Sequence, residues 1–121
     1  MGFPSYIKRT DGSVFTTFMH VDNIKSVAVS VTASGVVIPA VTGKTLKVFA
    51  VKLVCSAAVA INFNDGGASP LEGSQSFSAN GGVVEFVTPP AFLFQTTVGN
   101  SLNIDIVGAG TVSGRISYWE E

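Results

Sequence analysis

The chain has 121 residues, which is the size of one domain. Only 12% of its residues are Asp, Glu, Lys or Arg, against about 25% in an ordinary soluble domain. The net charge of -1 argues against a nucleic-acid partner, which requires a basic surface. No stretch reaches the roughly 18 uninterrupted apolar residues of a membrane-spanning helix. A surface so poor in charge therefore predicts that part of it is covered in an assembly.

The first twenty residues differ in texture from the rest of the chain. Aromatic residues alternate there with charged ones, and an Asp11-Gly12 turn signal lies between them. Nothing in this stretch has the apolar segment of a signal peptide. We expect residues 1–20 to form an extended N-terminal arm that lies across the domain or a neighbouring subunit. An extra edge strand with a frayed start is the alternative.

From residue 21 the pattern favours β-strands. Residues 23–32 alternate apolar and polar side chains, and the short stretch 36–40 contains Pro39, which suggests an edge strand. The longest apolar run follows in residues 41–63. Its first part is apolar on both predicted faces, with Leu46, Val48, Ala50 and Val54 on one and Phe49, Val51, Leu53 and Cys55 on the other. Such a strand is typically central in a sheet, and Cys55 is expected to be a buried small hydrophobe.

The second half continues with short strands separated by turns. Asn64-Asp65-Gly66-Gly67 is a strong turn signal, and Pro89-Pro90 is expected to interrupt a strand ladder. Short strands are expected near residues 76–79, 83–87, 92–96, 101–107 and 111–119. About eight short strands with glycine-rich turns predict an all-β protein, a single jelly-roll-type β-sandwich over residues 21–121. An immunoglobulin-like sandwich is the alternative, although its Cys…Trp…Cys pattern is absent.

The sequence offers no catalytic constellation. His20 is the only histidine, and Asp22 is too close in sequence to orient it in a usual triad. One histidine and one cysteine do not complete a zinc site, and the turn at Asp65 has a single carboxylate where calcium requires several. The acids Glu72, Glu85 and Asp105 show no spacing typical of a glycosidase pair. We therefore predict no enzyme activity, no metal and no cofactor.

Six segments carry a resemblance to a known family. In order they are AVTGKTLKV (40–48), SAAVAINF (56–63), LEGS (71–74), SANGG (78–82), TTVGNSLNIDI (96–106) and VSGRISYWEE (112–121). As an ordered set, between residues 38 and 121, they resemble small virion proteins and fibre modules of tailed bacteriophages. Residues 1–37 are not matched. The resemblance implies a jelly-roll domain, frequently trimeric, on the phage particle, with no enzyme and no cofactor.

This resemblance leads to an expectation of function. We expect a capsid decoration or cement protein, made in the host cytoplasm and located on the virion. It would bind the major capsid protein as a homo-oligomer, in particular a homotrimer, and stabilise the shell. The alternative is a tail-fibre or receptor-binding module that recognises host-surface glycan through Trp119 or the loops at 64–75 and 88–91. A terminal aromatic pair such as Tyr118-Trp119 more often closes a core or a subunit seam.

Two sets of contact residues follow from these expectations. The arm is expected to contact the capsid through Phe3, Tyr6, Ile7, Lys8, Arg9 and Phe15. The subunit interface is expected to include Val36, Ile38, Phe49 and Tyr118.

Overall fold

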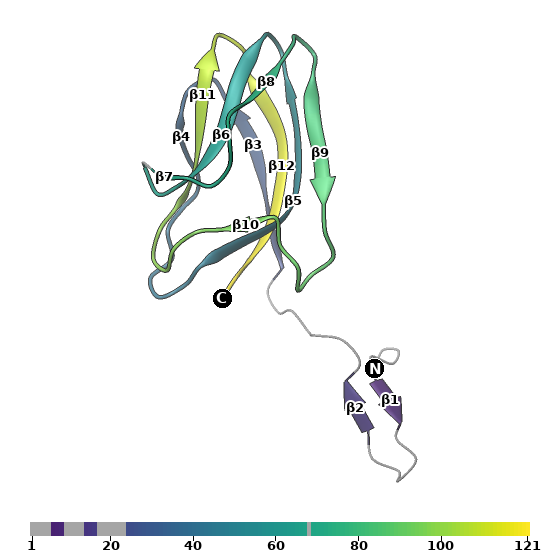
Figure 1. Ribbon diagram of the computed structural model, residues 1–121. Coiled ribbons are helices and arrows are strands. Elements are labelled where there is room, and N and C mark those ends of the chain that lie inside the picture. Colours follow the sequence, from purple (N-terminus) through teal and green to yellow (C-terminus); the bar gives the residue numbers. More distant parts are fainter. Residues whose placement is uncertain (1–5, 9–13, 17–23, 68) are drawn as a thin grey trace.

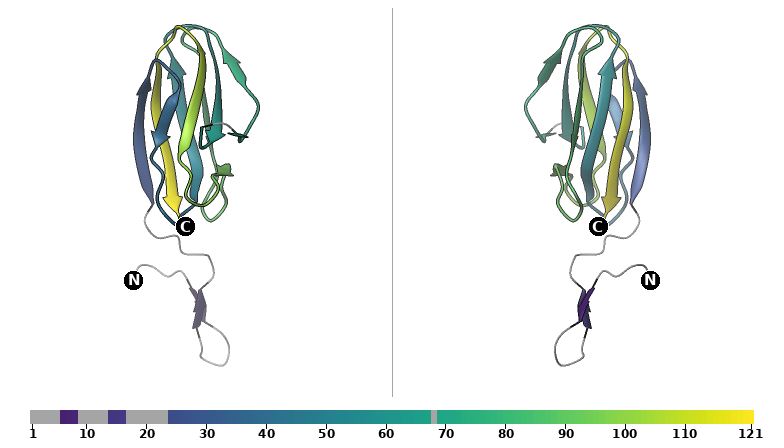
Figure 2. Two further views of the ribbon diagram at one scale, coloured as in Figure 1. Left: turned by 90° about the vertical axis from the view of Figure 1, so that its left-hand side faces the viewer. Right: turned by 90° about the vertical axis from the view of Figure 1, so that its right-hand side faces the viewer.

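The computed structural model describes residues 6–8, 14–16, 24–67 and 69–121. Two antiparallel sheets of five strands each pack face to face, and a separate two-stranded sheet lies near the N-terminus (Figure 1). The described residues contain strands and turns but no helix. The prediction of an all-β sandwich is therefore confirmed. Figure 2 shows the two layers of the sandwich from its sides.

We call the first layer the β5 sheet. Its strands run in the order β3–β12–β5, and β9 and β10 pair one after the other along the remaining edge of β5. The bounds of these strands are β3 (Lys25–Val31), β5 (Leu46–Cys55), β9 (Gly82–Phe86), β10 (Phe94–Gln95) and β12 (Val112–Glu120). The predicted central position of strand 46–55 is confirmed, because β5 has partners along both edges.

The second layer, the β6 sheet, has the same plan. Its order is β4–β11–β6, and β7 and β8 share the far edge of β6. The bounds are β4 (Gly35–Ile38), β6 (Val59–Asp65), β7 (Ser69–Pro70), β8 (Gln75–Phe77) and β11 (Leu102–Gly108). The predicted edge position of the strand before Pro39 is confirmed by β4. Proline suits an edge because it donates no backbone hydrogen bond.

The core lies between the two sheets and is built from alternating residues of each strand. Phe63 of β6 stacks on Phe94 of β10 with ring centroids 5.3 Å apart, which joins the layers. Cys55 is buried as predicted, and its thiol donates to the carbonyl oxygens of Ser78 and Gly81 at 3.1 and 3.2 Å. Fully buried core side chains include Ile38, Leu46, Leu53, Leu102, Ile104 and Ile116.

The predicted faces of strand 46–55 require a correction. Leu46 and Val48 are buried, and so are Val51, Leu53 and Cys55, so both groups contribute to the same core. Strict alternation places these groups on opposite faces. The pairing of β5 with β12 shifts register between Ser117 and Tyr118, which is a β-bulge on β5 at residues 49–50. One extra residue in a strand reverses the phase of every side chain beyond it.

The N-terminal region forms a hairpin rather than a strand of the sandwich. β1 (Tyr6–Lys8) pairs with β2 (Val14–Thr16), and neither belongs to the β5 sheet or the β6 sheet. In this ribbon Ile7 is paired with Phe15. These two strands therefore do not add an edge strand to the sandwich, which was the alternative expectation. A lone two-stranded hairpin is marginally stable in water.

Candidate functional site

The two outer faces of the sandwich differ in chemistry. On the β6 sheet, the outward positions of β6 and β11 carry Asn62 and Asp105, which are cross-strand partners, and the next pair is Asn64 with Asn103. Asn62 donates from its side-chain amide to Asn64 at 2.7 Å. On the β5 sheet the outward positions are apolar, small or cationic. The β6 sheet also exposes Val36 and Val107, but the β5 sheet places exposed Phe86 and Val84 beside two cations, and we take it as the candidate interaction surface.

The pairing of the strands arranges the outward residues of the β5 sheet in three rows that cross the strands. They are Phe86–Ala50–Ser117–Ser26, Val84–Lys52–Arg115–Ala28 and Gly82–Val54–Ser113–Ser30, running from β9 across β5 and β12 to β3. We call these residues the β5 face. Small side chains occupy most positions near β3, and the bulky apolar ones gather at β9.

A groove of about 210 Å³ lies in the β5 face. Ala50 and Ser117 contribute small side chains to its lining, and Val84 and Phe86 line the β9 side. Phe86 is 73% exposed and Val84 is 69% exposed, which is unusual for large apolar residues of a strand. Val54 in the next row is also exposed. A contiguous apolar patch of this kind typically marks an interaction site.

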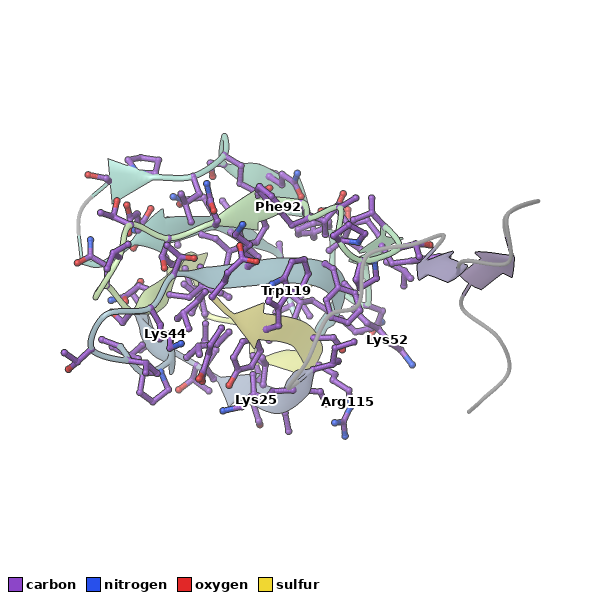
Figure 3. All side chains as sticks on the ribbon, turned by 90° about the horizontal axis from the view of Figure 1, so that it is seen from below. Lys25, Lys44, Lys52, Phe92, Arg115 and Trp119 are labelled. Carbon is purple, nitrogen blue, oxygen red and sulfur yellow. The ribbon has the colours of Figure 1, made fainter. Side chains whose placement is uncertain are left out.

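Two cations lie beside the apolar edge. Lys52 of β5 and Arg115 of β12 are cross-strand partners, both exposed, and Figure 3 shows their side chains pointing away from the sandwich. Arg115 donates to the Ser26 hydroxyl at 2.6 Å. Within residues 24–67 and 69–121, the ion pairs are Lys25–Glu120 and Lys47–Glu121, so neither Lys52 nor Arg115 forms an ion pair there. Glu85 also lines the groove but is not paired with either cation. The β5 face therefore combines apolar area with positive charge.

Trp119 lies on the same side of the sheet but is not available to a ligand. It is only 3% exposed, and its ring packs against Phe49 at 5.9 Å and Phe92 at 6.4 Å between centroids. Figure 3 shows Phe92 beside Trp119. The ammonium of Lys47 lies 4.9 Å from the centre of the Phe92 ring. The terminal tryptophan therefore closes an aromatic cluster, and stacking on a sugar requires Phe92 to move.

The expected subunit-interface residues have separate positions. Val36 is exposed on edge strand β4. Ile38 is 1% exposed in the core, so it offers almost no surface to a neighbouring subunit. It points between the sheets although Val36, two residues earlier, points outward, because the pairing of β4 with β11 shifts register between Leu102 and Asn103. Tyr118 is half-buried against the core, and half-buried Phe49 packs on Trp119. These four residues do not form one patch.

The expected capsid-contact residues belong to the N-terminal part of the chain. Phe3 and Arg9 lie outside the described residues, as does His20. The backbone places Tyr6, Ile7 and Lys8 in β1 and Phe15 in β2. Four of the six arm residues thus belong to one hairpin.

Asp65, the single carboxylate at the turn after β6, holds the loop that contains Thr97 and Asn100. Its carboxylate accepts from the Thr97 amide at 3.0 Å, from the Thr97 hydroxyl, and from the Asn100 side chain at 3.1 Å. Burial raises the pKa of Asp65, but these hydrogen bonds outweigh burial and the net pKa lies below its usual value. The strand continues to Asp65, and the turn follows with Gly66 at φ +65°.

Two of the three dispersed acids interact across the sandwich. Burial raises the pKa of Glu72, and the nearby charge of Glu85 raises it further. Asp105 is on the outer side of β11, where it accepts from the Ser34 hydroxyl at 2.9 Å. Among the residues that the structure describes, no group of three or more His, Cys, Asp or Glu is positioned to hold a metal ion. The described part of the chain also has no helix long and apolar enough to cross a membrane.

Sequence reasoning did not identify the β5 face. The pattern of residues 83–87 predicts a short strand but no preferred face, because Val84 and Phe86 alternate with Val83, Glu85 and Val87. The signal in the sequence was that this strand has apolar residues on both of its faces and only one acid, Glu85, which indicates an apolar side chain on the outer face as well. No match was found for this chain among protein-family models, curated proteins or solved structures.

Proposed function

We propose that this chain is a structural protein of a tailed-phage virion that decorates the capsid and stabilises the shell. The observation that carries the proposal is the β5 face, an open apolar sheet surface on a domain that is poor in charge. Phe86 and Val84 are largely exposed there. A soluble subunit with such a surface is suited to an assembly in which neighbours cover it. The family resemblance of residues 38–121 supports the same function.

The strand order supports the jelly-roll form of the sandwich. β12, the last strand, lies between β3 and β5, and β11 lies between β4 and β6. The final two strands are thus inserted between earlier strands of each sheet. This nesting is characteristic of two Greek keys wound together, the plan of a jelly roll.

The proposed mechanism is mechanical. Many copies bridge neighbouring capsid subunits, and each copy adds interface area that resists the pressure of packaged DNA. The N-terminal hairpin, β1 with β2, contacts the major capsid protein, and the sandwich associates with other copies as a homo-oligomer. A lone hairpin gains stability by packing on another surface, which supports its assignment to the shell contact. Neither enzyme activity nor a cofactor is part of this proposal.

Immunogold electron microscopy of the virion tests the location. Antibody raised against the purified protein is expected to label the head densely. Label confined to the tail tip would contradict decoration and favour the receptor-binding alternative, in which case a glycan array is the next measurement. Absence of label from intact particles would contradict both virion functions.

A deletion tests the role of the hairpin. Protein lacking residues 2–19 is expected to fold and to keep its oligomeric state, but to lose binding to capsids stripped of decoration. The sandwich strands begin at Lys25, so the deletion leaves every strand of both sheets intact. If the truncated protein coats the particles as well as the full chain does, the hairpin is not the shell contact.

A further inference from the structure

The outer side of the β6 sheet carries a second patch, whose charge is opposite to that of the β5 face. Val107 is 71% exposed and Val36 is 55% exposed. Asp105 is exposed between them along β11, and Val36 is the register partner of Asn103 on the neighbouring strand. We call Val36, Asn103, Asp105 and Val107 the β11 patch. It combines apolar area with one exposed carboxylate.

The two surfaces are complementary in kind. The β5 face offers exposed apolar side chains beside Lys52 and Arg115, and the β11 patch offers exposed valines around Asp105. An interface that buries apolar area and matches opposite charges gains both affinity and register. Both surfaces lie on strands of the sandwich, so neither has to order a loop on contact.

Charge also decides against the symmetric arrangement. If the β5 faces of two copies met about a two-fold axis through the middle row of the face, Lys52 and Arg115 of one copy would approach the same cations of the other, and like charges across an interface are unfavourable. A head-to-tail arrangement brings each cation pair to the carboxylate of the next copy. Such heterologous contacts either close into a ring or continue as a filament.

We propose that the β5 face of one copy docks on the β11 patch of a second copy, and that this contact is the intersubunit seam. The inference rests on the proposed function in so far as that function requires a homo-oligomer, and it specifies which surfaces form it. Lys52 and Arg115 select the partner through Asp105. Phe86 and Val84 supply apolar area. Ile38 and Tyr118 have no part in this seam.

Charge reversal with rescue tests the seam. Sedimentation velocity of the full chain over a range of concentrations measures the dissociation constant. Arg115→Glu and Asp105→Arg are each expected to weaken association at least about tenfold, because each places like charges together. The combined variant carries Lys52→Glu, Arg115→Glu and Asp105→Arg in every copy, which reverses the sign of every charge in the contact. It is expected to regain association to within about threefold of the unmodified protein.

Matched controls separate the seam from general effects of charge or apolar area. Lys44→Glu reverses an exposed cation in the loop before β5 and is expected to leave association unchanged. Phe86→Ser is expected to weaken association, whereas Val98→Ser, at another exposed apolar position, is not. Circular dichroism confirms that each variant is folded.

Three results would overturn the seam. They are a monomer at every concentration, single reversals that leave association unchanged, and single reversals that dissociate the protein without rescue by the combined variant. The outcome is separable from that of the virion proposal. Rescue without label on particles would support the seam and contradict decoration. Dense head label without rescue would support decoration and contradict this seam.

Discussion

Arg115 lies directly opposite Lys52 in the antiparallel pairing of β12 with β5, so two cations are neighbours on one exposed face. Like charges at directly opposed positions destabilise a sheet. The isolated subunit therefore gives up stability at this position. Proteins commonly carry such local destabilisation where a binding surface requires it.

Replacing one of these cations is expected to stabilise the isolated subunit. In a background of Asp105→Arg, which dissociates the proposed seam, Lys52→Glu should raise the free energy of unfolding by about 0.5 kcal/mol, because repulsion becomes attraction. Urea denaturation measures the change. Lys44→Glu in the same background is the control, with no gain expected. A loss of stability on Lys52→Glu would contradict the idea that the pair is repulsive.

Gly114→Ala is expected to destabilise the fold by more than about 2 kcal/mol. Gly114 has φ +156°, and a side-chain carbon built there collides with the backbone carbonyl of Lys52 on the paired strand. Thermal unfolding followed by circular dichroism measures the loss. Gly73→Ala, where nothing lies within 4 Å of the added carbon, is the matched control and should be nearly neutral. Equal effects at both positions would show that close strand approach is not the cause.

Asp65 should make stability fall at acid pH. Its folded-state pKa lies below the ordinary 3.8, so its contribution is complete above about pH 4 and is lost as the pH falls through the lower folded value. Asp65→Asn should cost about 1–2 kcal/mol at neutral pH, because Thr97 and Asn100 donate stronger hydrogen bonds to a charged carboxylate than to a neutral amide oxygen. Urea unfolding between about pH 7 and about pH 2.5 should show a smaller loss of stability at acid pH in the variant than in the unmodified chain. An unchanged pH profile would rule out this role.

Ionisation of Glu72 should lower stability as the pH rises, which is the opposite of the effect of Asp65. Its folded-state pKa lies above the ordinary 4.5, because burial and then the charge of Glu85 disfavour the ionised form. The advantage of the protonated form is complete below pH 4.5 and is lost as the pH rises through the folded value. Glu72→Gln should therefore raise stability at neutral pH by a few tenths of a kcal/mol to about 1 kcal/mol, and have little effect at pH 4. Equal effects at both pH values would contradict the assignment.

Removing Phe92 should expose the single tryptophan. Phe92 packs edge-on against Trp119, and with Phe92 in place the tryptophan is nearly inaccessible to solvent. Phe92→Ala is expected to shift the fluorescence emission to longer wavelength, to increase quenching by iodide, and to cost about 1 kcal/mol. Val98→Ala, at an exposed apolar site in a loop, is the control. Unchanged quenching in the variant would show that other groups cover the indole.

Much of the sandwich followed from local patterns. Pro39 predicted an edge strand, and the apolar run through Leu53 predicted a central one, because these preferences depend on backbone hydrogen bonding and on which faces are covered. The bulge at residues 49–50 was not predictable in this way. It is a property of the pairing with β12, since Ser117 and Tyr118 skip a residue of the partner strand.

Composition and local periodicity were sufficient to predict the fold class and the buried Cys55, because the alternation and clustering of apolar residues along the chain indicate strands and their buried faces. Contacts between distant segments decided the rest. The aromatic cluster of Trp119 with Phe92, the anchor of Asp65 to Thr97, and the approach of Glu72 to Glu85 each join residues of different strands or loops. The β5 face exists only because register aligns β9, β5 and β12, so that Phe86, Lys52 and Arg115 share one side of a sheet. Register is set by the whole folded pairing, and a single strand read alone does not contain it.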